Sequence, residues 1–225
     1  MFSDRSDAGK RLADAVIAES IEVDIVLGVP RGGVPVARVV ADRLSAPLDV
    51  VIARKIGAPD NPELALGAVA ADGSGWLNQS LIERLAVDDA YLEEARREEA
   101  NAAKARADRY RADRPAPDLT GKRVLVVDDG VATGATLKAC LRSVRSQGAA
   151  VVTVAVPVGP PDAIDALRRE ADRVICLEEP DPFRAVGAHY RTFEQVSDAA
   201  VLATLDTDGS GTESENGENG RNVSQ

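Results

Sequence analysis

Histidine and cysteine are scarce in this chain of 225 residues. His189 is the single histidine, and Cys140 and Cys176 form neither a disulfide framework nor the spacing of a zinc site. These absences exclude metal clusters built on histidine and cysteine. They also remove most mechanisms in which a histidine activates a nucleophile. We expect His189 to be a surface residue or part of a substrate hood.

Aromatic residues and long apolar runs are also rare. With three Phe, three Tyr and one Trp, the core must be built mainly from Val, Leu, Ile and Ala. No apolar run approaches the ~20 residues that cross a bilayer, and residues 1–7 lack the apolar stretch of a signal peptide. We therefore expect a cytoplasmic protein with no membrane partner.

Acidic residues outnumber basic ones, 37 to 27, which gives a net charge of −10. Such a field opposes binding to nucleic acid or to an anionic membrane surface, so we expect no nucleic-acid partner. A phosphate ligand would have to be held by a local site. The last twenty residues, 206–225, are polar and acidic with little to bury, and they predict a disordered acidic tail. The folded domain is predicted over residues 8–205.

Short apolar runs alternate with helical patterns along this domain. Strands are predicted at 25–29, 49–53, 66–70, 123–127, 151–156 and 173–177, with helices between several of them. Near-continuous apolar strands separated by helices indicate an α/β fold: a Rossmann-like, mostly parallel sheet with helices on both faces. Ligands of such sheets bind beyond the carboxyl ends of the strands.

A helical insertion near residues 78–114 interrupts the alternation. A short helix precedes a long one that starts near Asp88 and is supported by charge pairs such as Glu93 with Arg97. Two interpretations are open. The long helix is either a solvated helix packed lightly on the sheet, or a cap or dimer arm near the site.

The most specific stretch is 124–136, an apolar strand followed by Asp128, Asp129, a small-residue loop and Thr133-Gly134-x-Thr136. The backbone N–H groups of a loop that enters a helix form an anion cradle. The carboxylates repel phosphate but suit vicinal hydroxyls or a hydrated Mg²⁺. A ligand that offers phosphate to the loop and a diol to the acids is a sugar phosphate.

Four other interpretations fit this stretch less well. A response-regulator receiver needs a phospho-acceptor Asp after a later strand, and an aspartyl-phosphate hydrolase needs Asp-x-Asp rather than adjacent acids. A Walker loop needs Gly-Lys-Ser/Thr, which the chain lacks. A purely structural turn leaves the Thr-Gly-x-Thr pattern unexplained.

The stretch resembles the phosphoribosyl-pyrophosphate motif of the type I phosphoribosyltransferases, and the similarity extends from about residue 8 to 205. The segments 29–33, 53–57 and 195–198 resemble a branch of that family whose acceptor is generally unassigned. The resemblance implies the type I phosphoribosyltransferase fold. It also implies transfer of 5-phosphoribosyl from phosphoribosyl pyrophosphate to a nitrogenous base or similar small-molecule acceptor, with release of pyrophosphate.

The resemblance also implies roles for individual residues. The 5′-phosphate loop is Ala132, Thr133, Gly134, Ala135 and Thr136, and pyrophosphate is bound by Arg31, Gly32, Gly33, Arg54 and Lys55. The catalytic residues are Asp128, Asp129, Lys55 and Arg31. Mg²⁺ is expected mainly through the ligand, with water-mediated contacts to Asp128 and Asp129. A mobile loop at 57–63 and a cis peptide near Arg31 are further expectations.

The acceptor site is the least defined part. Ala132 occupies a position where enzymes acting on 6-oxopurines usually carry an Asp, which weakens that substrate class and leaves the general base unnamed. An acceptor hood would come from the helices of 78–114 or from the segment holding Phe183 and Tyr190, whose rings either stack on a base or pack in the core. A non-catalytic regulator that binds the same donor or a nucleotide is the alternative function. A homodimer is also left open.

Overall fold

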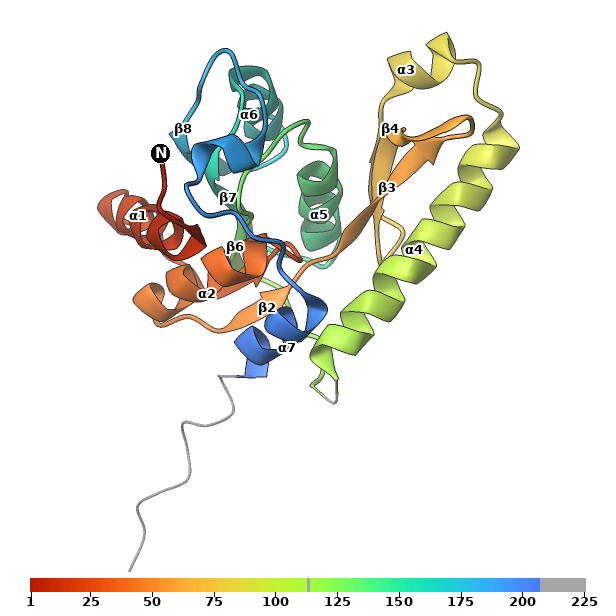
Figure 1. The fold of residues 1–225 in the computed structure, drawn as a ribbon. Helices are drawn as coiled ribbons and strands as arrows, with labels where there is room; N and C mark the ends of the chain where they lie inside the picture. Colours follow the sequence, from red (N-terminus) through yellow and green to blue (C-terminus); the bar gives the residue numbers. More distant parts are fainter. Residues whose placement is uncertain (113, 207–225) are drawn as a thin grey trace, which may run out of the picture.

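The chain contains two β-sheets, a larger parallel one and a smaller antiparallel one (Figure 1). The computed structural model describes residues 1–112 and 114–206. The predicted acidic tail, apart from Asp206, therefore lies outside the described residues.

The larger sheet has five parallel strands in the order β2-β1-β6-β7-β8. Its strands are β1 (Ile25–Gly28), β2 (Leu48–Val50), β6 (Arg123–Val127), β7 (Val151–Val158) and β8 (Arg173–Glu178). Nearly all residues of β1, β6 and β7 are buried, as expected for strands covered on both faces.

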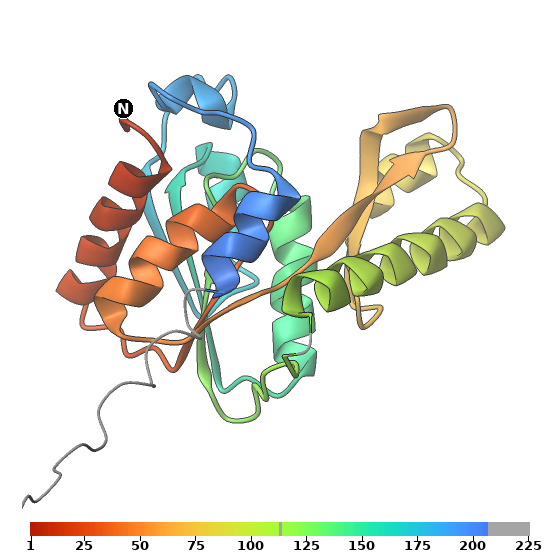
Figure 2. The ribbon, with the colours of Figure 1, turned by 60° about the horizontal axis from the view of Figure 1, so that its bottom comes forward.

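Helices cover both faces of this sheet, as the sequence predicts (Figure 2). One face carries α1 (Arg5–Ala18), α2 (Gly33–Leu44) and α7 (Asp198–Asp206). The other carries α5 (Ala135–Ser146) and α6 (Pro161–Arg168). The predicted α/β class with a parallel sheet is confirmed.

The smaller sheet is antiparallel and was not predicted. It consists of β3 (Ala53–Ala58), β4 (Asn61–Ala70) and β5 (Gly75–Leu77). The run 66–70 is a strand, but its expected place in the parallel sheet is wrong. Leu66 and Val69 pack into a cluster that includes Leu92 of the long helix, and Ala68 packs against α5. Because both faces of β4 are covered, its sequence looks like that of a parallel core strand.

The predicted helical insertion is confirmed as α3 (Gln79–Arg84) and α4 (Asp89–Arg111), the latter capped by Asp88. Together with β3–β5, these helices form an arm that stands out from the larger sheet (Figures 1 and 2). Four residues of α4 are buried: Leu92 packs on the smaller sheet, and Ala103, Ala107 and Tyr110 join a core cluster of the larger sheet. The charge pairs within this helix are Glu93–Arg96 and Glu94–Arg97, not the expected Glu93–Arg97.

The folded part begins earlier than the predicted residue 8. Phe2 is 1% exposed, packs on Tyr190, and its N–H donates to the His189 carbonyl at 2.8 Å. Helix α1 then starts at Arg5. No helix among the described residues is long and apolar enough to cross a membrane.

Candidate functional site

The loops that follow β1 and β6 lie side by side, because these two strands are neighbours in the larger sheet. Gly28 of β1 and Val127 of β6 are opposite each other in register, so the loops that follow them must meet. A Cβ on Gly32 would lie 1.9 Å from Asp129 Oδ2, and one on Gly33 would lie 2.8 Å from the Asp128 Cα. The two glycines therefore let the first loop pack against the acidic pair.

Gly32→Ala should lower the free energy of unfolding by about 1–3 kcal/mol, because the new methyl group overpacks this contact. The φ of Gly32 is −65°, so backbone strain adds nothing. The measurement is urea unfolding. In an Asp129→Ala background the same change should cost much less, since the carboxylate that the methyl group meets is gone. An equal cost in both backgrounds would contradict this explanation.

The second loop presents unpaired backbone donors. The N–H groups of Ala132, Thr133 and Gly134 donate no hydrogen bond within the described chain. Gly134 has φ +76°, a left-handed conformation that glycine adopts without strain, and α5 starts at the next residue. The loop and the first turn of α5 therefore have the form of an anion cradle.

This loop lines a cavity of about 180 Å³, into which the arm contributes one residue, Lys55 of β3. The other lining residues are Asp128, Gly130, Val131, Ala132, Thr133, Gly134, Ala135, Thr136, Leu137 and Val186. The Lys55 side chain makes no hydrogen bond or ion pair with any described residue. Its ammonium group is thus available to an anion in the cavity.

Arg54 does not line this cavity. Successive residues of a strand point to opposite faces, and the Arg54 guanidinium pairs with Glu99 on α4. The Arg31 side chain also points elsewhere: it lines a groove with Arg54 and residues of α4 and α7. The structure therefore separates these two arginines from Lys55, although the sequence grouped all three. The Pro30–Arg31 peptide bond is cis.

In the first loop, two backbone amides are left unpaired. The N–H groups of Arg31 and Gly32 donate to no described residue, whereas that of Gly33 donates to the Val29 carbonyl at 3.0 Å. Of the two glycines that the sequence assigned to pyrophosphate, only Gly32 offers a free donor.

The acidic pair is partly buried at the junction of the two loops. Asp128 Oδ1 accepts from the Asp129 N–H at 2.8 Å. Burial and the charge of Asp129 raise the pKa of Asp128 well above its ordinary 3.8. Burial also raises the pKa of Asp129, although the guanidinium of Arg5 opposes the shift.

Arg5 is a site residue that the sequence did not reveal. Its Nη2 and Nε lie 2.8 and 2.9 Å from Asp129 Oδ2, and its guanidinium stacks over Phe193, 3.9 Å from the ring centroid. Arg5 and Asp129 are 124 residues apart, and no motif connects them. Only the packing of α1 against the sheet brings them together.

Lys138, one turn into α5, was also missed. It is 8% exposed, lies 4.2 Å from the centroid of the Trp76 ring, and burial lowers its pKa. No pattern in the sequence distinguishes Lys138 from the other basic residues of this helix, Arg142 and Arg145.

Beyond the phosphate loop lies a larger hollow of about 690 Å³. Its lining includes Ala132, Thr133, Lys138 and Phe183. The Phe183 ring stacks on His189, with centroids 5.6 Å apart and planes at 7°. Tyr190, by contrast, is buried against Phe2 and Phe193, and its hydroxyl donates to the Asp129 carbonyl at 2.6 Å. Of the two aromatic residues proposed for a hood, only Phe183 lies at this hollow.

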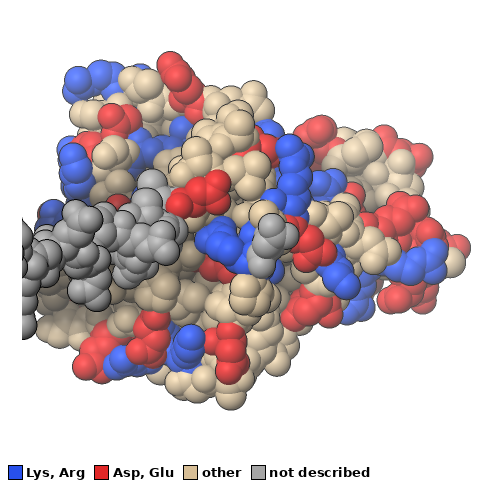
Figure 3. All heavy atoms as spheres, turned by 90° about the horizontal axis from the view of Figure 1, so that it is seen from below, with Lys and Arg blue, Asp and Glu red and all other residues tan. Residues whose placement is uncertain are grey.

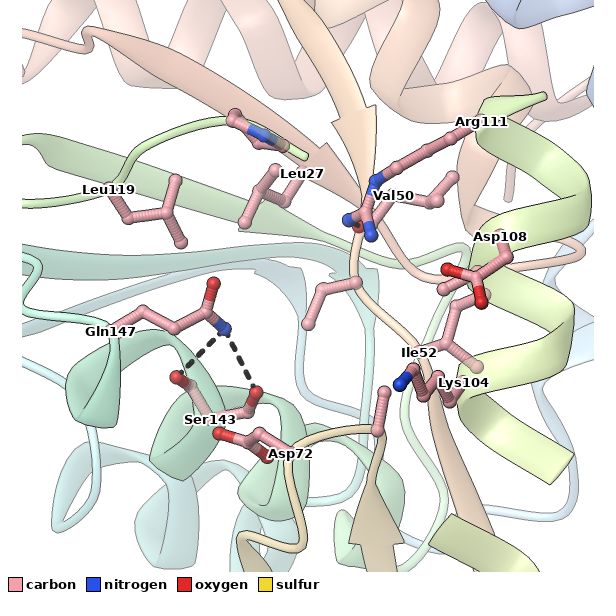
Figure 4. A pocket seen from close by; sticks show the side chains of 14 residues that line it. Leu27, Val50, Ile52, Asp72, Lys104, Asp108, Arg111, Leu119, Ser143 and Gln147 are labelled. Atoms are coloured by element: carbon pink, nitrogen blue, oxygen red, sulfur yellow. Dashed lines mark hydrogen bonds between the residues drawn. The ribbon is translucent and has the colours of Figure 1, made fainter. Parts of the chain in front are cut away.

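Another pocket, of about 290 Å³, lies between α4 and α5 at the edge of the larger sheet (Figure 4). Apolar residues such as Leu27 and Ile52 line it, and Gln147 spans part of one wall, where its amide donates to the Ser143 carbonyl and hydroxyl. None of the predicted site residues lines this pocket. The paired loops, rather than this pocket, concentrate the predicted chemistry.

A parallel sheet with an acidic pair and a phosphate-type loop beyond its strands defines an α/β domain of the phosphate-binding class. The family of the phosphoribosyl transferase domain matches residues 4–191, and the chain belongs to that family.

Similar proteins agree with this assignment. Two proteins of Mycobacterium tuberculosis, from strains CDC 1551 and H37Rv, are named "putative phosphoribosyl transferase" and are each 46% identical over 206 residues. That alignment covers 92% of this chain but 46% of each relative, so the chain spans about half the length of the curated relatives it matches. The crystal structure of TT1426 from Thermus thermophilus is 45% identical with a TM-score of 0.78, covering 91% of this chain and 97% of that one.

Proposed function

We propose that this chain transfers the 5-phosphoribosyl group from phosphoribosyl pyrophosphate to a nitrogenous base or similar small acceptor, releasing pyrophosphate. The observation that carries the proposal is the cavity lined by Lys55, Asp128 and the loop before α5. It combines a free ammonium group, a carboxylate and unpaired N–H donors within about 180 Å³.

In this proposal the loop 132–136 holds the 5′-phosphate, and Asp128 accepts hydrogen bonds from the ribose hydroxyls. Asp129 is engaged by Arg5, which supports a positioning role for its carboxylate beside the sugar. Lys55 and the free amides of Arg31 and Gly32 would stabilise the charge that develops on departing pyrophosphate. Holding both ends of the ribose places C1′ toward the acceptor, so positioning supplies part of the rate.

Mg²⁺ belongs to the proposal as an ion that the donor brings. Among the described residues, no three His, Cys, Asp or Glu side chains are grouped as metal ligands. The donor's own oxygens would therefore supply most ligands, and Asp128 is the cavity carboxylate suited to a water-mediated contact. When bound, the ion neutralises charge on the pyrophosphate.

The acceptor is proposed to enter the hollow beyond Ala132 and Thr133. Both residues line the hollow and also the cavity that contains Lys55 and Asp128, which we call the donor cavity. The two spaces therefore adjoin. Phe183 offers an apolar ring at the far side, and Asp162, Asp181 and Lys138 are polar groups available for hydrogen bonds. With Ala132 in place of an acid, these groups would have to set the preference for the acceptor.

Pyrophosphate release from phosphoribosyl pyrophosphate, assayed with Mg²⁺ against a panel of purine, pyrimidine and pyridine bases, tests the function. We expect release with at least one acceptor and none without. Tight binding of the donor with no turnover on any acceptor would instead favour the regulator. Absence of donor binding would overturn the transferase and leave, of the alternative, only a regulator that binds a nucleotide.

A further inference from the structure

A groove of about 430 Å³ collects four arginines from three parts of the chain. Arg31 follows β1, Arg54 lies on β3, and Arg106 and Arg109 lie on α4. The small side chains of Ala102 and Ala105 complete the α4 wall, and Asp198 closes the groove at the start of α7. Figures 1 and 2 both show the C-terminal half of α4 beside α7.

One carboxylate, that of Asp198, serves as the common partner in this groove. It accepts from the Tyr110 hydroxyl at 2.5 Å and lies 3.2 Å from both Arg106 and Arg109, with Arg31 at 3.8 Å. The Tyr110 hydrogen bond and Arg106 hold the pKa of Asp198 below its ordinary value. Three donors thus share the two oxygens of Asp198, while each guanidinium, with five N–H groups, retains donors.

The charges of the groove do not cancel. Arg54 is matched by Glu99, whereas Arg31, Arg106 and Arg109 share Asp198 alone. Four arginines against two carboxylates leave an excess of two positive charges, in a chain whose net charge is −10. Seen from below, the molecule shows basic and acidic side chains interspersed, without a continuous basic surface (Figure 3). An excess of two charges in a chain of net charge −10 suits a small anion rather than a nucleic acid.

We propose that this arginine groove is a second anion-binding site, separate from the donor cavity, that takes a small phosphorylated molecule. A guanidinium group can donate two parallel hydrogen bonds to the oxygens of one phosphate. The two unmatched positive charges favour a ligand with about two negative charges. The separation follows from β3, where Lys55 lines the donor cavity and Arg54 the groove. Asp198 belongs to the 195–198 motif, for which the transfer reaction provides no role.

Calorimetric titration with inorganic pyrophosphate tests the proposal by counting sites. The native chain should bind pyrophosphate at two sites. Lys55→Met should abolish pyrophosphate binding in the donor cavity. The double variant Arg106→Gln with Arg109→Gln should weaken pyrophosphate binding in the arginine groove at least tenfold. Arg96→Gln with Arg97→Gln, on the same helix but outside the groove, is the matched control and should change neither event.

Because Arg106 also contacts Tyr110, a second variant guards against misfolding. Ala105→Glu adds a negative charge to the groove and removes no existing contact, and it should weaken the same event. The proposal is overturned if the native chain binds at one site only, if Lys55→Met abolishes all binding, or if Ala105→Glu has no effect. The proposed transfer function is tested separately, by turnover of the donor in the pyrophosphate-release assay.

Discussion

Asp128→Asn is expected to weaken binding of phosphoribosyl pyrophosphate by about 10- to 100-fold, the cost of a lost hydrogen bond to a charged group. The fold should remain stable. Asp128 is partly buried beside Asp129, and burial already disfavours the ionised form of Asp128, so removal of its charge should cost no stability. Calorimetry gives the affinity, and thermal unfolding should show an unchanged or higher midpoint. Asp165→Asn, whose partner is Arg168 on the same helix, is the matched control and should leave affinity intact.

The same residue predicts a pH dependence. As the pH falls through the raised pKa of Asp128, its carboxylate is protonated and donor affinity should fall. For folding the sign is opposite: a carboxyl whose pKa is raised in the folded state stabilises the fold below its ordinary 3.8, and this stability is lost as the pH rises through the raised value. Asp128→Asn should flatten both profiles. An unaltered affinity profile in that variant would remove Asp128 from the diol-binding role.

Lys55→Met is expected to lower kcat/KM for the donor by about 100- to 1000-fold, whereas Arg54→Met should change it by about threefold at most. The two residues are adjacent in sequence, but only Lys55 lines the donor cavity. Arg54 pairs with Glu99 and lines the arginine groove. Pyrophosphate release under donor-limited conditions provides the measurement.

This pair of variants is its own control, since both remove one positive charge from β3. Long-range electrostatics would affect both variants alike, so a large difference between them reports contact with the donor. Equal losses in both would show that the charge of the strand, rather than the position of Lys55, matters. A large loss only in Arg54→Met would contradict the proposed site.

Local pattern sufficed for the five parallel strands and for the helices that connect them, but not for α1 and α7, which also cover the sheet. Continuous apolar runs such as 124–127 and 151–156 indicate strands buried on both faces, and their alternation with helices implies a parallel sheet. The phosphate-type loop could also be found, because its acids, small residues and helix start are consecutive. Its place at the end of β6 then follows from general rules for parallel sheets.

The arm could not be predicted from the same signals. β4 is apolar because α4 and α5 cover its two faces, and this coverage gives a sequence indistinguishable from that of a parallel core strand. Lys55 and Arg54 are adjacent in the sequence, but the alternation of side chains along β3 directs them to different cavities.

The sequence by itself determined the class of fold, the phosphate-type loop and the acidic pair, because each depends on residues near one another in the chain. Only the tertiary structure decided which distant groups face them: Arg5 against Asp129, Lys55 in the cavity, and three arginines around Asp198. These contacts arise from helices and strands that pack after long separations in sequence. No local pattern encodes their partners, because packing selects a residue for its burial and charge and not for its position along the chain.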